Sequence, residues 1–153
     1  MLAAMRFPPQ EDYAMGQADG KLLELGELLA RLQPELAEML RWVDEVWELY
    51  AAEVRRRGTW PDDPAEWTWR DAAAYCAARE SVDLETEIGA AYVRAMDALD
   101  ACYTRLDPIC YKILSLKAHT RKGRAVRKMA RAIQTGGVAV RNTMAKKSDC
   151  TRA

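Results

Sequence analysis

The feature that most constrains the fold is an uninterrupted heptad repeat between Leu22 and Tyr50. Apolar residues recur there in alternating steps of three and four, at Leu22, Leu25, Leu29, Leu32, Leu36, Met39, Val43, Val46 and Tyr50. This spacing keeps one stripe of a helix facing a partner helix. A helix with such a stripe depends on packing for its stability, so the rest of the chain must supply its partner.

A second repeat of the same length can be that partner. Its members follow the same alternation, at Ile88, Tyr92, Ala95, Leu99, Cys102, Leu106, Ile109, Ile113 and Leu116. Residues 51–87 join the repeats and are numerous enough to reverse the chain direction. We therefore predict an all-α protein built on an antiparallel hairpin of long helices, residues 22–57 against 82–117. The contacts expected between them involve Leu29, Leu36 and Val43 on one side and Leu99, Leu106 and Ile113 on the other.

The composition agrees with a helical protein outside the membrane. Of 153 residues, 50% are hydrophobic and 30% are charged, which suits a single folded domain. No run of apolar residues is long enough to predict a membrane span, and residues 1–20 lack the apolar core of a secretory signal. We therefore expect a cytoplasmic protein that does not associate with membranes.

Capping and breaking residues predict the helix ends. Asp19 is the expected N-cap of the first long helix, and Gly58 is expected to follow its end. Ser81 is the expected N-cap of the second long helix. Pro34 and Pro108 lie inside the two repeats, where each predicts a kink or a break.

The connection between the repeats is rich in tryptophan. Residues 58–63 predict a loop, and Asp63 and Pro64 predict the start of a short helix that ends near Arg79. Clustered tryptophans there have two interpretations: they close the end of the helix pair, or they form an interface with a partner. The three residues concerned are Trp60, Trp67 and Trp69.

Charge divides the chain although its net charge is zero. Residues 1–111 hold 11 Lys+Arg and 22 Asp+Glu, whereas residues 112–153 hold 12 Lys+Arg and one acid. The net charges are therefore −11 and +11. Such asymmetry points to an anionic partner, or to the acidic part of the same chain.

A last amphipathic helix is predicted within the basic segment. Thr120 is its expected N-cap, the helix covers residues 121–134, and Gly136-Gly137 is expected to close it. The resulting domain scheme is a flexible lead-in over 1–20, a helical domain over 21–136 and a flexible basic tail over 137–153.

Six cations of this helix are the candidate binding residues, namely Arg121, Lys122, Arg124, Arg127, Lys128 and Arg131. Cations along a helix suit contacts to phosphates, and no helix-turn-helix pattern predicts the recognition of a base sequence. The sequence therefore predicts a non-catalytic binding or assembly protein whose basic segment contacts an anionic partner, most simply nucleic acid. An acidic protein is a second candidate partner for the same segment.

Two other functions remain open. The basic helix can dock on the acidic residues of the first helix, which would leave a structural, self-assembling helical module. The acidic residues concerned are Glu24, Glu27, Glu35 and Glu38. Alternatively, the acidic helices serve as an adaptor or inhibitor that binds a nucleic-acid-binding protein.

Catalytic signatures are weak. His119 is the only histidine and has no second histidine with which to hold a metal, and the four cysteines lack C-x-x-C spacing. The pairs of acids, such as Asp97 with Asp100 or Glu85 with Glu87, suit exposed helix faces. We therefore expect no enzyme, no metal site and no cofactor.

Apolar residues beside the repeats favour a homo-oligomer. Leu23, Trp47 and Met96 lie off the heptad positions, so a lone hairpin would leave apolar surface uncovered. A dimer that forms a four-helix bundle would cover it.

Two segments resemble a known group of proteins. "ADGKLLELGELLARLQPEL" from residue 18 and "ICYKILSLKAHTRKGRAVRKMARAI" from residue 109 are similar to short helical proteins of unknown function, common in alphaproteobacterial genomes and often found among mobile-element genes. Those proteins open with "DAELLALGxxLxxL" and close with "IxALPATTLxGLxVKARA". The matching residues are Leu22, Leu23, Leu25, Gly26 and Leu29, and then Ile113, Leu116, Thr120, Gly123, Val126 and Ala130.

The resemblance covers about a third of the chain and departs from the pattern at two places. His119 replaces a small residue, and Arg121-Lys122 adds charge. What the resemblance implies is an all-helical fold, with no known activity.

Overall fold

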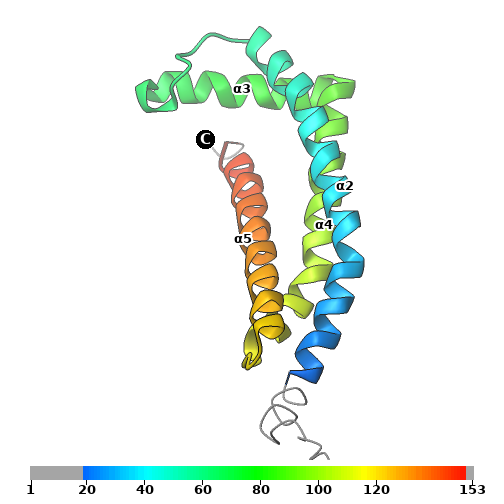
Figure 1. Cartoon of the computed structure of the whole chain (residues 1–153). Helices are drawn as coiled ribbons and strands as arrows, with labels where there is room; N and C mark the ends of the chain where they lie inside the picture. Colours follow the sequence, from blue (N-terminus) through cyan, green and yellow to red (C-terminus); the bar gives the residue numbers. More distant parts are fainter. Residues whose placement is uncertain (1–18, 151–153) are drawn as a thin grey trace, which may run out of the picture. The chain divides into compact units, whose positions relative to one another are not determined.

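The computed structural model describes residues 19–150, with side chains described to residue 144. Its elements in chain order are α2 (Gly20–Arg56), the short 3-10 helix η1 (Pro64–Glu66), α3 (Trp69–Glu85), α4 (Glu87–Ser115) and α5 (Arg121–Cys150) (Figure 1). No strand occurs among these residues. The prediction of an all-α protein with a short tryptophan-rich helix between two long ones is confirmed.

The helices pack into two compact units, each of which contains parts of α2, α4 and α5. The first unit comprises residues 19–34 and 105–135, with 11 Lys+Arg against 4 Asp+Glu, a net charge of +7. The second comprises residues 35–104 and 136–150, with 10 Lys+Arg against 17 Asp+Glu, a net charge of −7. We call them the basic unit and the acidic unit. The three long helices run through both units, and the predicted single helical domain over 21–136 stays a prediction.

The divisions between the units fall at weak points of the helices. In α2 the division follows Pro34, and in α4 it follows Thr104, whose carbonyl lacks the usual donor because residue 108 is proline. In α5 the division precedes Gly136. Both proline-containing helices are nevertheless continuous, so neither Pro34 nor Pro108 produces the break that the sequence allowed.

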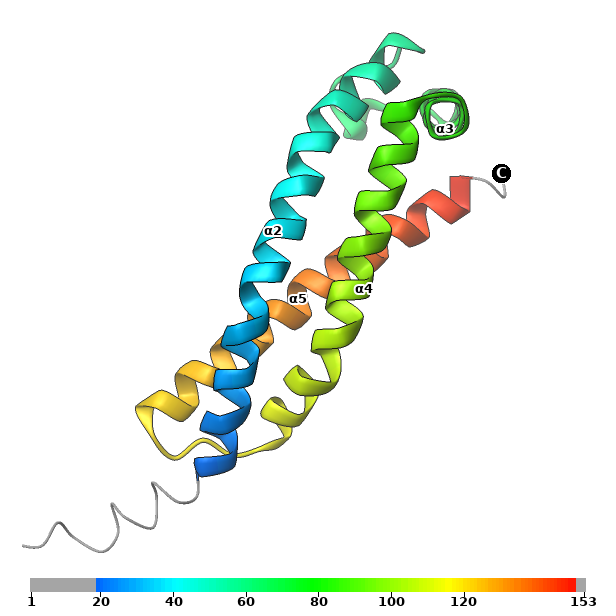
Figure 2. The same cartoon turned by 90° about the vertical axis from the view of Figure 1, so that its right-hand side faces the viewer.

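Ten of the eighteen heptad positions are buried, and the other eight are half-buried. Within each unit the α2 and α4 segments lie side by side and run in opposite directions (Figure 2). Five of the six expected contact residues are buried, and the sixth, Val43, is half-buried. The buried five are Leu29, Leu36, Leu99, Leu106 and Ile113.

Helix α5 covers the side of the hairpin that was expected to stay open. In the basic unit its Ala130 and Ile133 are buried, and in the acidic unit its Val140 and Met144 pack against the core cluster. Met96, one of the residues that suggested a dimer, is buried within the single chain. Leu23 is half-buried and Trp47 is 38% exposed, so the homo-oligomer stays a prediction.

The boundary between α3 and α4 differs from the prediction. Ser81 lies inside α3, and the chain turns at Thr86. The Thr86 hydroxyl donates to the Val82 carbonyl (2.7 Å) and accepts from the Gly89 amide (2.9 Å), so one side chain serves both helix ends. A Cβ at Gly89 would lie 2.0 Å from the Val82 carbonyl oxygen, which is why glycine follows the turn.

The short helix also begins later than predicted. Asp63 does cap a turn, since its Oδ1 accepts from the Ala65 amide at 2.9 Å, but that turn is only η1. Helix α3 starts after Thr68, which forms a reciprocal capping box with Asp71 and carries the helix on to Glu85. The predicted end at Arg79 is therefore wrong.

The predicted end of α5 is also wrong, because Gly136-Gly137 lies within the helix and α5 continues to Cys150. The glycines are explained by packing within the acidic unit. A Cβ at Gly136 would lie 2.5 Å from the Tyr103 hydroxyl, and one at Gly137 would lie 3.2 Å from the same ring. The predicted basic tail from residue 137 thus begins inside a helix. Residues 1–18 of the predicted lead-in lie outside the described residues.

Candidate nucleic-acid interface

The first turn of α5 is fixed by Thr120, as the sequence predicted. The Thr120 hydroxyl accepts from the Gly123 amide at 3.0 Å, and its carbonyl accepts from the Arg124 amide at 3.1 Å. The first bond satisfies one of the amides that a helix start leaves without partners, and the second is the first backbone bond of the helix. The start of α5 is therefore fixed at Thr120.

Asp19 then ties the start of α5 to the start of α2. Its backbone carbonyl accepts from the Leu23 amide at 2.8 Å, as an N-cap residue of α2 should. Its carboxylate, however, accepts from the amides of His119 (3.0 Å) and Thr120 (2.9 Å), and the Thr120 hydroxyl donates to it as well. The Asp19 side chain thus caps the other helix, which its position in the sequence did not reveal.

This carboxylate is fully buried and its charge is held by hydrogen bonds. The bond from the Thr120 hydroxyl, followed by that from the His119 amide, holds the pKa of Asp19 below its ordinary value of 3.8. A carboxylate beside a helix N-terminus also interacts favourably with the helix dipole. The anion site that a helix N-terminus offers is therefore already occupied by a residue of the chain.

Two glycines allow α2 and α5 to approach closely inside the basic unit. A Cβ at Gly26 would lie 2.6 Å from a Val126 methyl carbon, and one at Gly123 would lie 2.2 Å from the Asp19 carboxylate. Both contacts are shorter than real Cβ contacts, so a side chain at either position would force Val126 or Asp19 to shift. One face of α5 is thereby held against α2.

The opposite face of α5 carries the cations. At 3.6 residues per turn, four of them fall within an arc of about 80°, roughly opposite the buried Gly123, Ala130 and Ile133. We call these four, Arg121, Arg124, Lys128 and Arg131, the basic stripe; all are exposed. Lys122, also exposed, and Arg127, half-buried, lie on either side of it.

These six cations are not neutralised in the described part of the chain. None of them forms an ion pair there, and the one polar contact among them runs from Arg124 Nη1 to the His119 carbonyl at 3.4 Å. Glu24, a predicted internal partner, pairs with Lys21 at 3.0 Å. Four of the six predicted residues, those of the basic stripe, therefore lie together on the exposed face of α5.

The three tryptophans do not form one surface. Trp60 is 7% exposed and meets Trp67 and Tyr75 edge to face, with centroid distances of 6.4 and 5.4 Å. The Trp67 and Tyr75 rings are tilted to each other at 5.0 Å. The Trp67 indole donates to the Pro61 carbonyl at 2.7 Å. Only Trp69, 76% exposed, remains available to a partner. Trp60 belongs to the core cluster of the acidic unit and Trp67 packs against it, and the predicted partner interface of the three tryptophans stays a prediction.

Arginines at the end of α2 bind the connecting segment and α3. Arg55 donates to the Trp60 carbonyl (2.8 Å) and to Asp62 (2.7 Å), and its guanidinium lies 5.2 Å from the Trp60 ring centroid. In the sequence, the position of these arginines at the end of the helix suggests only a favourable interaction with the helix dipole. The sequence does not identify their partners. Arg55 is therefore part of the packing of the acidic unit.

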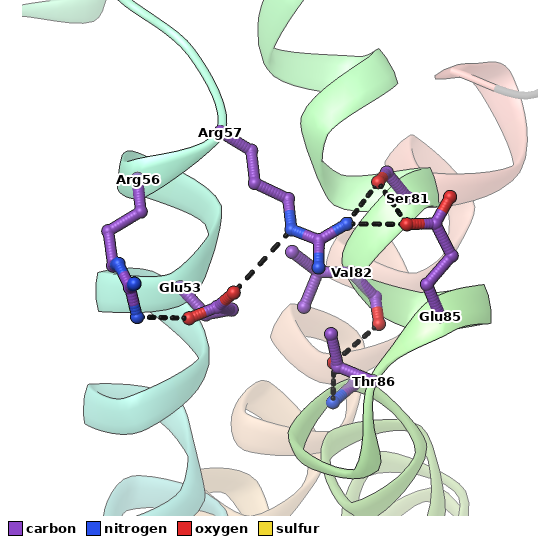
Figure 3. A network of polar contacts seen from close by, with 8 residues as sticks. Glu53, Arg56, Arg57, Ser81, Val82, Glu85 and Thr86 are labelled. Atoms are coloured by element: carbon purple, nitrogen blue, oxygen red, sulfur yellow. Dashed lines mark hydrogen bonds and ion pairs between the residues drawn. The ribbon is translucent and has the colours of Figure 1, made fainter.

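Arg57 makes a similar link to α3 (Figure 3). Arg57 directly follows α2; it contacts Glu53 of α2 at 3.5 Å and Glu85 of α3 at 2.7 Å, and it donates to the Ser81 hydroxyl. Its guanidinium and the Ser81 hydroxyl lower the pKa of Glu85, and Glu85 in turn raises the pKa of Arg57. These cations are committed to acids of the acidic unit, unlike those of the basic stripe.

The centre of the acidic unit contains a buried arginine among tyrosines. Arg79 is 9% exposed, donates from Nε to the Tyr50 hydroxyl at 3.2 Å and lies over the Tyr50 and Tyr75 rings. Tyr50 stacks on Tyr92 at 4.2 Å, and burial raises the pKa of both phenols. A cavity of about 80 Å³ lies beside Arg79, Tyr92 and Met96. The buried guanidinium of Arg79 is thus held by one phenol hydroxyl and two aromatic rings.

The catalytic candidates do not converge on a site. His119 is exposed in the loop before α5, Glu85 pairs with Arg57, and Asp100 pairs with Arg141 at 3.7 Å. Burial raises the pKa of the Cys110 thiol to about 11, which disfavours the thiolate that acts as a nucleophile. Among the described residues, no three His, Cys, Asp or Glu side chains gather as a metal site.

Comparison of the chain with protein-family models, with curated proteins and with solved structures finds no match. Within the described range, no helix has both the length and the hydropathy that a membrane span requires.

Proposed function

We propose that this chain is a non-catalytic helical protein that binds nucleic acid through the basic stripe of α5, without preference for base sequence. The observation that carries the proposal is the state of these four cations, which are exposed, lie on one helix face and have no acid partner among the described residues. Cations in this state gain most from phosphates, because binding releases the counterions of the nucleic acid.

Contacts to phosphates fit the surroundings of the stripe. The opposite face of α5 is held against α2 by the contacts of Gly26 and Gly123, and its N-terminus is occupied by Asp19. The large exposed side chains on the N-terminal half of α5 are the four cations of the stripe and Lys122; the exposed Ala125 and Ala132 are small. Phosphate contacts position a protein on a nucleic acid but carry no direct sequence information, so binding to any sequence is expected.

Charge reversal tests the proposal in the full chain. Arg124→Glu, Lys128→Glu and Arg131→Glu together should abolish binding to a nucleic acid at about 50 mM salt, and binding of the unmodified chain should fall steeply with salt. Truncation after Gly136 is a poorer test, because it removes Val140 and Met144 from the core. Undiminished binding by the triple variant would place the site elsewhere.

A second candidate function rests on the acidic unit. In it, α2 exposes Glu38, Asp44, Glu45 and Glu48, and the unit as a whole has a net charge of −7. Such a surface suits an adaptor or inhibitor that binds a basic, nucleic-acid-binding protein. Failure of the chain to bind nucleic acid at low salt would favour this function, or a purely structural, self-assembling module.

The residues that carry the resemblance to short helical proteins from mobile elements lie largely in the basic unit. Six of the residues that carry the resemblance are buried in the basic unit, namely Leu22, Gly26, Leu29, Ile113, Gly123 and Ala130. We infer that the pattern describes how α2, α4 and α5 join, and that proteins sharing it share this helical junction.

A further inference from the structure

The basic part of the chain lacks the side chains that bind unpaired bases. All 12 Phe, Trp and Tyr residues lie within residues 1–111, and residues 112–153 contain none. Within the described basic unit the only such residue is Tyr111, on α4, which is 75% exposed. Proteins that bind single strands combine a basic groove with aromatic side chains on which successive bases stack. The basic stripe offers charge without this stacking surface.

The stripe is also fixed and regular. Its four cations follow in steps of three, four and three residues from Arg121 to Arg131 of α5, and these ten steps span about 15 Å at about 1.5 Å per residue. Along the axis of a duplex, the phosphates of one strand recur about every 3.4 Å, so about four phosphates occupy the same length. A rigid row of cations suits a rigid row of phosphates better than it suits a flexible strand.

Resting on the proposed function, we infer that the ligand of the basic stripe is duplex nucleic acid, which it contacts at the backbone of the double helix, and that single strands bind more weakly. The charge density of the duplex sets the size of the difference. Log K falls with log salt by about 0.9 per phosphate contact for a duplex and about 0.7 for a single strand. If the two probes bind equally near 1 M salt, these slopes make four contacts bind the duplex about tenfold more tightly at about 50 mM salt.

The test compares two probes on the full chain. A mixed-sequence DNA duplex of about 20 base pairs and one of its separated strands, with the same label, are titrated by fluorescence anisotropy at several salt concentrations. We expect tighter binding of the duplex and a salt slope near −3.6 for four contacts, against about −2.8 for the strand. Equal or tighter binding of the single strand would overturn the inference and leave the proposed function intact.

Matched single substitutions locate the contacts. Lys128→Gln removes a cation of the stripe and should weaken duplex binding about tenfold while lowering the salt slope by about 0.9. Arg31→Gln removes an exposed cation from α2 of the same unit and should change duplex binding less than twofold. Equal losses from both substitutions would overturn the assignment to the stripe.

Tyr111→Ala tests the contribution of stacking. We expect the affinities for both probes to be unchanged, because a backbone contact uses no base stacking. A loss of single-strand binding in this variant would show that bases stack on Tyr111 and would overturn the inference. Binding of neither probe at about 50 mM salt would overturn both this inference and the proposed function.

Discussion

The basic unit and the acidic unit use segments of the same three long helices and differ in how those segments are held. In the basic unit, aliphatic residues form the core, and a buried carboxylate, Asp19, joins two helix starts. In the acidic unit, stacked and edge-on aromatic rings surround Arg79, and further arginines pair with acids. Similar helices thus reach stable packing by two different routes.

The difference bears on which cations are available to a ligand. In the acidic unit, the arginines at the end of α2 bind Asp62, Glu53 and Glu85, so their charge contributes to packing. In the basic unit, close packing around Gly26 and Gly123 and the Asp19 cap hold α5 in place without using its cations. The basic stripe therefore remains free to bind an external anion.

The largest effect is expected from a charge placed in the basic core. Leu29 is fully buried, so Leu29→Asp should cost more than about 4 kcal/mol and abolish cooperative unfolding. Leu28→Asp is the matched control, because Leu28 is next to Leu29 on the same helix but is 36% exposed. This variant should lose about 1 kcal/mol of stability or less. Thermal unfolding followed by circular dichroism distinguishes them; similar losses would contradict the assigned core face.

A smaller loss is expected from a single methyl group at the junction of α2 and α5. Gly123→Ala should destabilise the chain by about 1–3 kcal/mol, because the new Cβ displaces the Asp19 carboxylate and presses on Leu22. Gly20→Ala adds the same methyl where no atom lies within 4 Å and should be neutral within about 0.5 kcal/mol. Denaturant titration measures both, and a stable Gly123→Ala variant would show that the cap can shift at little cost.

The comparable change in the acidic unit is the loss of one hydroxyl. Tyr50→Phe removes the acceptor for the buried Arg79 while keeping the stacking on Tyr92, and should cost about 1–2 kcal/mol. Tyr111→Phe removes a hydroxyl from a ring that is 75% exposed and should have no measurable effect. If Tyr50→Phe were equally neutral in denaturant titration, the rings alone would hold this unit.

The smallest effects should appear at the extremes of pH and should differ between the units. Because folding lowers the pKa of Asp19, its contribution is complete above its unfolded pKa of about 3.8 and is lost as pH falls through the lower folded value. The melting temperature should therefore fall in acid, and Asp19→Asn should lower it at neutral pH while removing this part of the acid dependence. A constant difference between variant and unmodified chain from pH 6 to pH 2 would contradict the role of Asp19.

At high pH the acidic unit should weaken instead. Burial raises the pKa of Tyr50 and Tyr92 above the ordinary value of 10.0, so their contribution is complete below pH 10 and is lost as pH rises through the folded pKa values. Hydrogen exchange at residues of the two units, measured near pH 3 and near pH 10.5, would show which unit opens first. Exchange that rises equally in both units at each extreme would contradict the comparison.

The sequence by itself determined the helices and their buried faces. A heptad repeat leaves little choice of partner surface, because any other rotation of the helix would expose its apolar stripe. The Thr120 cap and the basic stripe were also predictable, since both depend on local spacing along a helix. The six cations of the predicted site therefore lie on the helix where the sequence placed them.

Only the tertiary structure decided where helices end and which polar groups meet. Gly136-Gly137 stays helical because Tyr103 packs against it, and α3 passes Ser81 because Thr86 serves both neighbouring helices. The Asp19 carboxylate bonds to amides 100 and 101 residues away. Caps and breakers predict helix ends from local preferences worth about 1 kcal/mol each, and packing between distant segments readily outweighs them.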